Sequence, residues 1–409
     1  MSIIRLSVLG DGTYAPDQAG NISPEEFSSR RGKDSRGEGR MDKYLRGARP
    51  RPGDPLWRYL EKSLSVEAAK LPADKPVTVM VHGFQFDPAS VVMRPPHHHK
   101  ADNPHARLYH FEEHDELREM KAHSTSWPLG LGFAEGDGGA EGLCIGFGWY
   151  SNPGFFSSLF DHGMNFYAKA YRNAEDAAWQ LLCTLEILTT VLDRKVDLFC
   201  HSLGSRVVVR ALAMAASPLS DLGAMVDGRL TPGAWTETLD RVDRVVILAG
   251  AEKVLEAQLM MSLLTTLRAE GTDVTPWFFN IVSRENDVLD KLGENFGPSS
   301  PGSKQVIGHN GLEKRDVNWV DVQLDDVLVG EWFHDAHGLK ISGDNQSSVF
   351  AVMDHWIHYT WRDNMKVYNR ILRERDAWSV PGLKAVRHKG EDIFNKIRLN
   401  RGKGFRSFD

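Results

Sequence analysis

Short apolar runs alternate along most of the chain with longer segments in which apolar residues recur every three or four positions. The apolar runs are typical of buried strands and predict them at residues 3–9, 77–81, 143–149, 196–200, 244–250, 277–282 and 319–324. The periodic segments predict helices at residues 54–71, 167–188, 207–216, 254–267 and 365–373. Strands that alternate with helices imply βαβ crossovers. We therefore expect an α/β fold with a mostly parallel central sheet that is covered by helices on both faces.

The spacing of these elements fits one α/β domain over residues 1–409, with its core at about residues 77–373 and a polar lead at residues 1–53. Residues 84–141 are far longer than one crossover needs, so we interpret them as an insertion that acts as a lid. Residues 379–409 form a basic tail with eight Lys and Arg against three acidic residues. These charges are interspersed, so we expect a solvated helix face there.

The composition narrows the class of protein. The chain is 41% hydrophobic and 25% charged, as globular proteins are, and its net charge of −6 gives no general attraction to nucleic acid. No run approaches the ~18 apolar residues of a membrane helix, and the first residues do not read as a secretory signal. Three cysteines (Cys144, Cys183 and Cys200) are too few for a disulfide framework and suit a reducing compartment. We expect a cytoplasmic protein without a membrane span; the oligomeric state stays open.

The strand predicted at residues 196–200 runs directly into His201-Ser202-Leu203-Gly204 and then into a helix. In this context a G-x-S-x-G sequence forms a nucleophile elbow, a tight turn that exposes the serine hydroxyl above the sheet. The turn needs a small residue on each side of the serine. Gly204 supplies one, and Cys200 stands where the other glycine is expected. Because cysteine is compact, we expect a slightly adjusted elbow with Ser202 as nucleophile; a buried structural serine is the alternative.

A second motif, His82-Gly83-Phe84, follows the strand at residues 77–81. With the elbow, it makes the chain resemble the serine lipases and esterases of the α/β-hydrolase superfamily, over residues 77–373 in chain order. The strand FGWYS at residues 147–151 is similar to one in a little-characterised group of bacterial hydrolase-like proteins that has no firm substrate.

The resemblance implies an α/β-hydrolase fold and an oxyanion hole formed by the backbone N–H groups of Phe84 and Leu203. The alternative for His82-Gly83 is a core histidine at a glycine-terminated strand end.

The resemblance also implies a triad in the chain order serine, acid, histidine, with the acid just past the strand at residues 277–282. Asp287 is the best candidate because it lies a few residues into the following loop, and Asp290 and Glu285 are the runners-up. Asp287 would orient the histidine and stabilise its charged form without taking the proton. A solvated loop carboxylate is the structural alternative.

The histidine should follow the strand at residues 319–324 and precede the last helix. His355 is favoured because it stands in an aromatic-rich turn that leads directly into that helix. His334 and His337 are the alternatives, and we expect His358 to be a structural histidine. The base would take the Ser202 proton and return it to the leaving group.

These residues predict a serine hydrolase that cleaves carboxylic esters of small molecules through an acyl-enzyme, without a cofactor. A thioesterase, amidase or lactonase would use the same triad. A non-catalytic α/β-hydrolase-fold binding protein and a histidine-liganded metal hydrolase are alternatives from other classes. Ser202 together with eligible acids and histidines favours catalysis.

Seven of the 16 histidines lie between His97 and His123. His110 and His114 are four residues apart, as zinc ligands on a helix are, but Phe111 stands where H-E-x-x-H has its general-base glutamate. The acidic residues that could complete a metal site are Asp102, Glu112 and Glu113. Nothing fixes their geometry, so we favour a polar, partly exposed lid. Its apolar residues would contact an acyl chain: Leu108, Tyr109, Phe111, Trp127, Leu129, Leu131 and Phe133.

Overall fold

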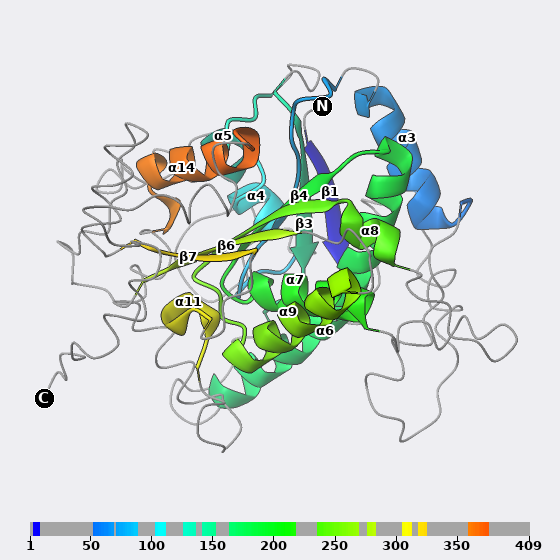
Figure 1. The fold of residues 1–409 in the computed structure, drawn as a ribbon. Helices are drawn as coiled ribbons and strands as arrows, with labels where there is room; N and C mark the ends of the chain where they lie inside the picture. Colours follow the sequence, from blue (N-terminus) through cyan, green and yellow to red (C-terminus); the bar gives the residue numbers. More distant parts are fainter. Residues whose placement is uncertain are drawn as a thin grey trace, which may run out of the picture.

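A computed structural model describes residues 3–8, 52–68, 71–88, 103–111, 126–135, 141–152, 163–217, 235–269, 276–283, 305–312, 318–324 and 359–375 (Figure 1). Its centre is a seven-stranded sheet in the order β1-β3-β2-β4-β5-β6-β7, and every neighbouring pair is parallel. The strands are β1 (Ile3–Val8), β2 (Val77–Val81), β3 (Leu143–Trp149), β4 (Val196–His201), β5 (Val242–Leu248), β6 (Trp277–Val282) and β7 (Trp319–Gln323). All seven lie where apolar runs predict them, so the α/β class is confirmed.

The five predicted helices are present as α3 (Pro55–Ala68), α6 (Gly163–Leu192), α7 (Gly204–Ala216), α9 (Val254–Ala269) and α14 (Arg362–Arg373). Within the described ranges, four further helices have only four or five residues, too few for a periodic pattern, and the sequence did not predict them: α4 (Pro104–Arg107), α5 (Trp127–Gly130), α8 (Thr236–Asp240) and α11 (Ile307–Asn310). In Figure 1, α5 and α14 lie on one side of the sheet and α6, α7 and α9 on the other. The expectation that helices cover both faces is confirmed.

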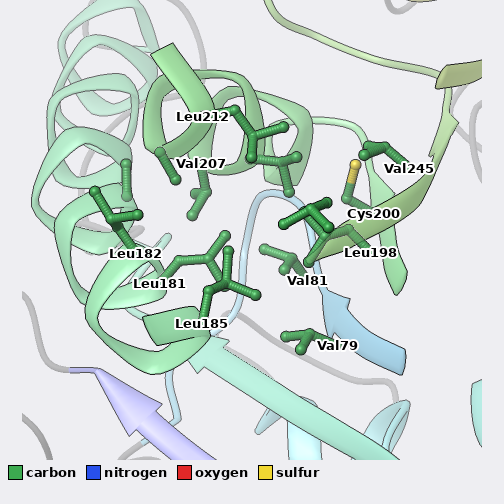
Figure 2. Close-up of a cluster of buried hydrophobic side chains, with 14 of the residues drawn as sticks. Val79, Val81, Leu181, Leu182, Leu185, Leu198, Cys200, Val207, Leu212 and Val245 are labelled. Atoms are coloured by element: carbon green, nitrogen blue, oxygen red, sulfur yellow. The ribbon is translucent and has the colours of Figure 1, made fainter. Parts of the chain in front are cut away.

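Each face of the sheet has its own hydrophobic core, because successive strand residues point to opposite faces. One core joins alternate residues of β2, β4 and β5 to α6 and α7, as Figure 2 shows for Val79, Val81, Leu198, Cys200 and Val245. The intervening strand residues belong to the other core, which includes α14 and the segments around α4 and α5. With both faces buried, every strand reads as an almost continuous apolar run.

The strand order changes direction next to β2. From β2 the chain crosses to β3, toward the β1 edge, whereas from β4 it crosses to β5, toward the β7 edge. The carboxyl ends of β2 and β4 are adjacent, and the connections that follow them leave in opposite directions. In open α/β sheets, ligands bind in the crevice that forms at such a switch point. His82 and Ser202 follow these two strand ends.

The sheet begins nearer the N-terminus than the expected core boundary at Val77. β1 pairs along its whole length with β3, from Ile3 opposite Cys144 to Val8 opposite Trp149. This short apolar strand forms one edge of the sheet, so residues 3–8 of the lead contribute directly to the fold.

Described parts of the insertion at residues 84–141 contribute to the core beside α14. Tyr109 is fully buried, and its ring lies where a side chain at Gly146 of β3 would be. Five of the apolar residues proposed for acyl-chain contact are buried in this core: Leu108, Tyr109, Trp127, Leu131 and Phe133. Residues 89–102 and 112–125 lie outside the described residues, and a lid there stays a prediction.

All three cysteines are buried and free. Among the described helices, none combines the length and the apolar character that a bilayer crossing requires.

The chain that follows α14 is fixed to the amino ends of β4 and β5. Asp197, the second residue of β4, is fully buried and accepts hydrogen bonds from the Arg244 backbone N–H (3.2 Å) and the Arg375 guanidinium (3.2 Å). Arg244 in turn donates to the carbonyl oxygens of Ile371 and Arg375. Burial, opposed by the charges of Arg375 and Arg244, raises the pKa of the Asp197 carboxyl to about 6.

Replacing Asp197 by Asn should change the pH dependence of stability. Because the folded-state pKa lies above the unfolded value of about 3.9, the carboxyl destabilises the fold increasingly as the pH rises between these two values. An amide does not ionise, so the unfolding free energy of Asp197→Asn should rise relative to that of the native protein, by up to about 3 kcal/mol, across that window. Urea unfolding at a series of pH values measures the difference.

Asp193→Asn is the control, because the Asp193 side chain is 84% exposed in its pair with Arg241. Parallel curves for Asp197→Asn and the native protein would contradict the prediction.

Candidate active site

Ser202 occupies a sharp turn between β4, which ends at His201, and α7, which begins at Gly204. Its φ angle is 52°, in the left-handed region that is unfavourable for a residue with a side chain. Hydrogen bonds hold the turn on both sides. The Ser202 N–H donates to the Leu248 carbonyl of β5 (2.9 Å), and the Ser202 carbonyl accepts from Ala251 N–H (3.0 Å) and Ser205 Oγ (2.7 Å). The predicted strand–turn–helix context of the serine is confirmed.

Two glycines make this turn possible. A Cβ atom on Gly83 would lie 2.8 Å from Ser202 Cβ, and one on Gly204 would lie 2.5 Å from the His82 carbonyl oxygen. The ends of β2 and β4 therefore touch at Ser202, and the requirement for a small residue at position 204 is confirmed. Cys200, at the other position, is fully buried and lies in the core beside Leu198 and Val245 (Figure 2).

His82 fixes the end of β2 to the end of β3. Its Nε2 accepts a hydrogen bond from the Trp149 backbone N–H (2.9 Å), so Nδ1 carries the proton that is donated to the Gly83 carbonyl (2.9 Å). The Trp149 indole donates to the His82 carbonyl (2.9 Å) and stacks on the imidazole. Burial lowers the pKa of His82 to about 3. The His82 side chain is therefore a neutral core histidine at a glycine-terminated strand end, which is the alternative given for this motif in the sequence analysis.

The two residues expected to donate to an oxyanion lie on the two segments that meet at Ser202. Phe84 follows Gly83 directly, and its half-buried side chain packs against the core that includes α6 and α7. Leu203 is buried and is the N-cap residue of the 13-residue helix α7. Backbone N–H groups at a helix N-terminus favour negative charge. This end of α7 is therefore suited to stabilise an anion beside Ser202.

An aromatic arrangement lines the other side of the turn. The His201 imidazole makes edge contacts with the rings of Trp127 and Tyr359, each at 6.4 Å between ring centroids. These contacts bring the chain just before α14 next to the elbow. β6 is the second strand from β4 in the sheet. Its carboxyl end is joined to the chain after β5, because the Ala249 N–H donates to the Ile281 carbonyl (3.1 Å).

The candidate acids and bases lie outside the described residues. This holds for the acid Asp287 and its alternatives Glu285 and Asp290, and for the histidines His355, His334, His337 and His358. The choices among them stay predictions.

One part of this region was missed in the sequence. Arg206, the third residue of α7, is 4% exposed and forms an ion pair with the fully buried Glu252 (3.0 Å), which follows β5. The signal was present, because an arginine in the small-residue segment GSRVVVRALAMAA is out of place unless it has a buried partner. The sequence does not say which acid that partner is.

Two described histidines of the dense cluster have structural contacts. The His105 ring is buried beside Ser7, with Nε2 2.9 Å from Ser7 Oγ, and burial lowers its pKa to about 3. His110 Nε2 donates to the Arg107 carbonyl (3.1 Å). Within the described ranges, no three His, Cys, Asp or Glu residues are grouped as metal ligands. The other five histidines of the cluster lie outside those ranges.

No model of a known protein family matches the chain, and no curated protein matches it. Among solved structures, it is similar to the Bacillus licheniformis lipase BlEst2 in its propeptide form, with 12% sequence identity and a TM-score of 0.31. The match covers 74% of this chain and 51% of that chain, so the chain spans about half the length of the lipase. A similarity this low carries no weight for the site.

Substituting Gly204 by Ala should destabilise the protein, because the added Cβ would press on backbone oxygens that cannot rotate away. We expect a loss of about 1–3 kcal/mol of unfolding free energy, the typical cost of overpacking a close-packed interior. Thermal unfolding measures the loss. Gly53→Ala is the control, because a Cβ there meets nothing within 4 Å and only the φ of 91° is unfavourable. A Gly204→Ala variant that is no less stable than Gly53→Ala would refute the steric argument.

Proposed function

We propose that the chain is a serine hydrolase that cleaves carboxylic esters, with Ser202 as the nucleophile. The observation that carries this proposal is the conformation of Ser202, which has a left-handed φ of 52° on a strand–helix turn. The turn packs against Gly83 and is followed by Gly204, and neither glycine has room for a side chain. Unfavourable backbone conformations persist where surrounding structure holds them, and they cluster at active sites. The turn also lies at the switch point of the sheet, where ligands bind in α/β folds.

The reaction would have two steps. Ser202 Oγ attacks the ester carbonyl carbon while its proton passes to the base, and the N–H groups of Phe84 and Leu203 stabilise the oxyanion. The base then gives the proton to the departing alcohol, leaving an acyl-serine. Water attacks the acyl-serine through the same base and releases the acid.

His355 is the proposed base. The contact between Tyr359 and His201 places residue 359 beside the elbow, and His355 is four residues earlier in the chain. Four extended residues reach about 14 Å at most, and this short connection supports His355 as a residue that can reach Ser202. His334 and His337 are 22 or more residues from Tyr359 and lack this restraint. His358, next to Tyr359, shares it, so the restraint separates His355 from His334 and His337 only.

Asp287 is the proposed acid. Ser283, which follows β6, is buried and donates its N–H to the Gly308 carbonyl (3.3 Å). Gly308 N–H in turn donates to the carbonyl of Gly250 (2.8 Å), next to Ala251, which binds the Ser202 carbonyl. Asp287 comes four residues after Ser283, so a carboxylate there has a short path to a histidine near Ser202.

We also propose that the fold is that of the α/β hydrolases. The support is the chain order of the site: an oxyanion segment after β2, a nucleophile after β4, and candidate acid and base residues after β6 and β7.

A fluorophosphonate probe tests the nucleophile, because it phosphonylates activated serines. The native protein should be labelled, and Ser202→Ala should lose the label and about a thousandfold or more of p-nitrophenyl ester turnover. Ser262→Ala, at an exposed serine on α9, is the control and should retain both. A folded native protein that is not labelled would refute the hydrolase and favour a binding protein on the same scaffold.

The base is tested separately by histidine substitutions. His355→Ala should lower kcat for p-nitrophenyl esters by about a thousandfold or more and slow probe labelling, since Ser202 would lack its proton acceptor. His334→Ala, His337→Ala and His358→Ala should each stay within a few-fold of the native protein. Turnover that survives in His355→Ala and is lost in one of the other three would reassign the base.

A further inference from the structure

Arg206 has an unusually complete set of partners for a buried charge. Its Nη1 donates to both carboxylate oxygens of Glu252 (3.0 and 3.1 Å), its Nη2 to Glu175 (2.5 Å) and its Nε to the Tyr171 carbonyl (2.8 Å). The guanidinium also lies over the Tyr171 ring, 3.4 Å from the centroid. The Tyr171 hydroxyl donates to Glu252 (2.7 Å). Three elements, α6, α7 and the segment after β5, are joined by this one side chain.

The cluster reaches Ser202 through one hydroxyl. Ser205 Oγ donates to the Ser202 carbonyl (2.7 Å) and accepts the Glu252 backbone N–H (3.1 Å). The Ala251 N–H adds a second hydrogen bond to the same carbonyl (3.0 Å). The carboxylate that Arg206 holds therefore belongs to the residue whose backbone anchors the turn.

Stability alone does not account for this arrangement. Burying two charges costs solvation energy, and apolar side chains of similar volume often replace a buried ion pair without loss of stability. What such a pair provides is a defined geometry, because a planar guanidinium fixes its partners in angle as well as distance.

We propose that Arg206, Glu252 and Ser205 form a positioning cluster for the elbow. The cluster holds the Ser202 carbonyl, so that the Leu203 N–H and Ser202 Oγ keep the orientation that attack and oxyanion binding need. This inference rests on the proposed hydrolase function. The three residues act through the backbone and do not touch the substrate.

A second ion pair that also starts from an arginine of α7 supplies a matched control. Arg210 lies one turn after Arg206 on α7 and pairs with Glu256 of α9 (2.7 Å) and with Glu175 (3.7 Å). This pair also joins α7 to the chain after β5, and its described partners are carboxylates away from Ser205. Arg206→Met/Glu252→Gln and Arg210→Met/Glu256→Gln make the same chemical change at the two sites.

The test compares both double variants and Ser205→Ala with the native protein. Arg206→Met/Glu252→Gln should lower kcat for p-nitrophenyl esters and the rate of fluorophosphonate labelling by about tenfold or more, with KM within about twofold, since misplacing a reacting group acts on the chemical step. Ser205→Ala should lower both kcat and the labelling rate. Because this substitution removes no charge, it tests the cluster even if the double variant does not fold. Arg210→Met/Glu256→Gln should leave both rates within about twofold.

Amide hydrogen exchange by mass spectrometry gives a readout without turnover. Peptides that cover residues 200–206 and 249–254 should exchange faster in Arg206→Met/Glu252→Gln and Ser205→Ala than in the Arg210→Met/Glu256→Gln control. Equal rates and equal exchange in all variants would overturn the positioning cluster. If even the native protein is not labelled, the proposed function fails, and the exchange data still decide whether the cluster fixes the turn.

Discussion

The close approach of two backbone segments at Ser202 is the constraint on which the site depends. The chain leaving β2 passes so near the turn after β4 that neither Gly83 nor Gly204 has room for a Cβ atom. Parallel strands alone do not require this contact, since neighbouring strands lie about 4.8 Å apart and usually separate into their loops. Here the segments stay together beyond the ends of the strands. The left-handed Ser202 and the first turn of α7 both lie at that contact.

Buried polar groups fix β4 at both ends, by different means. At its start, Asp197 meets Arg244 and Arg375 and carries a raised pKa. At its end, the residues after the strand are tied through Ser205 to a charge pair that has several partners. Between these ends the strand is entirely buried, and its contacts are apolar packing and ladder hydrogen bonds. Side-chain hydrogen bonds and ion pairs therefore fix the two ends of β4, and backbone pairing and apolar packing hold its middle.

The sequence predicts those parts of the structure that local pattern controls. Strands buried on both faces leave apolar runs, and helices with one buried face leave a three-to-four spacing, so the seven strands and five long helices could be located. The elbow could be located as well, because Ser202 and Gly204 stand in a recognisable spacing after a strand. The sequence predicts a slightly adjusted elbow because Cys200 replaces the usual glycine, and the cysteine side chain is accommodated in the core.

Other features depend on contacts between distant residues and leave no local pattern. The position of β3 between β1 and β2 in the sheet cannot be predicted from the local sequence of any one strand. Helices such as α4 and α5 are held by burial of Tyr109 and Trp127 against the sheet, not by periodicity. Arg206 is conspicuous in the sequence, but Glu252 lies 46 residues away and only the fold selects it. The triad partners of Ser202 could be proposed only from chain order.

The contact between His201 and Tyr359 has a consequence for how the molecule is made. The described contacts of the turn at Ser202 come from Gly83, α7 and the end of β5, and all of these precede Glu252 in the chain. The aromatic contact of His201 with Tyr359 needs a residue that is synthesised much later. Contacts of such long sequence separation form late in folding. The segments that hold the turn at Ser202 are therefore synthesised well before Tyr359, and a polypeptide truncated before α14 would lack the aromatic contact at His201.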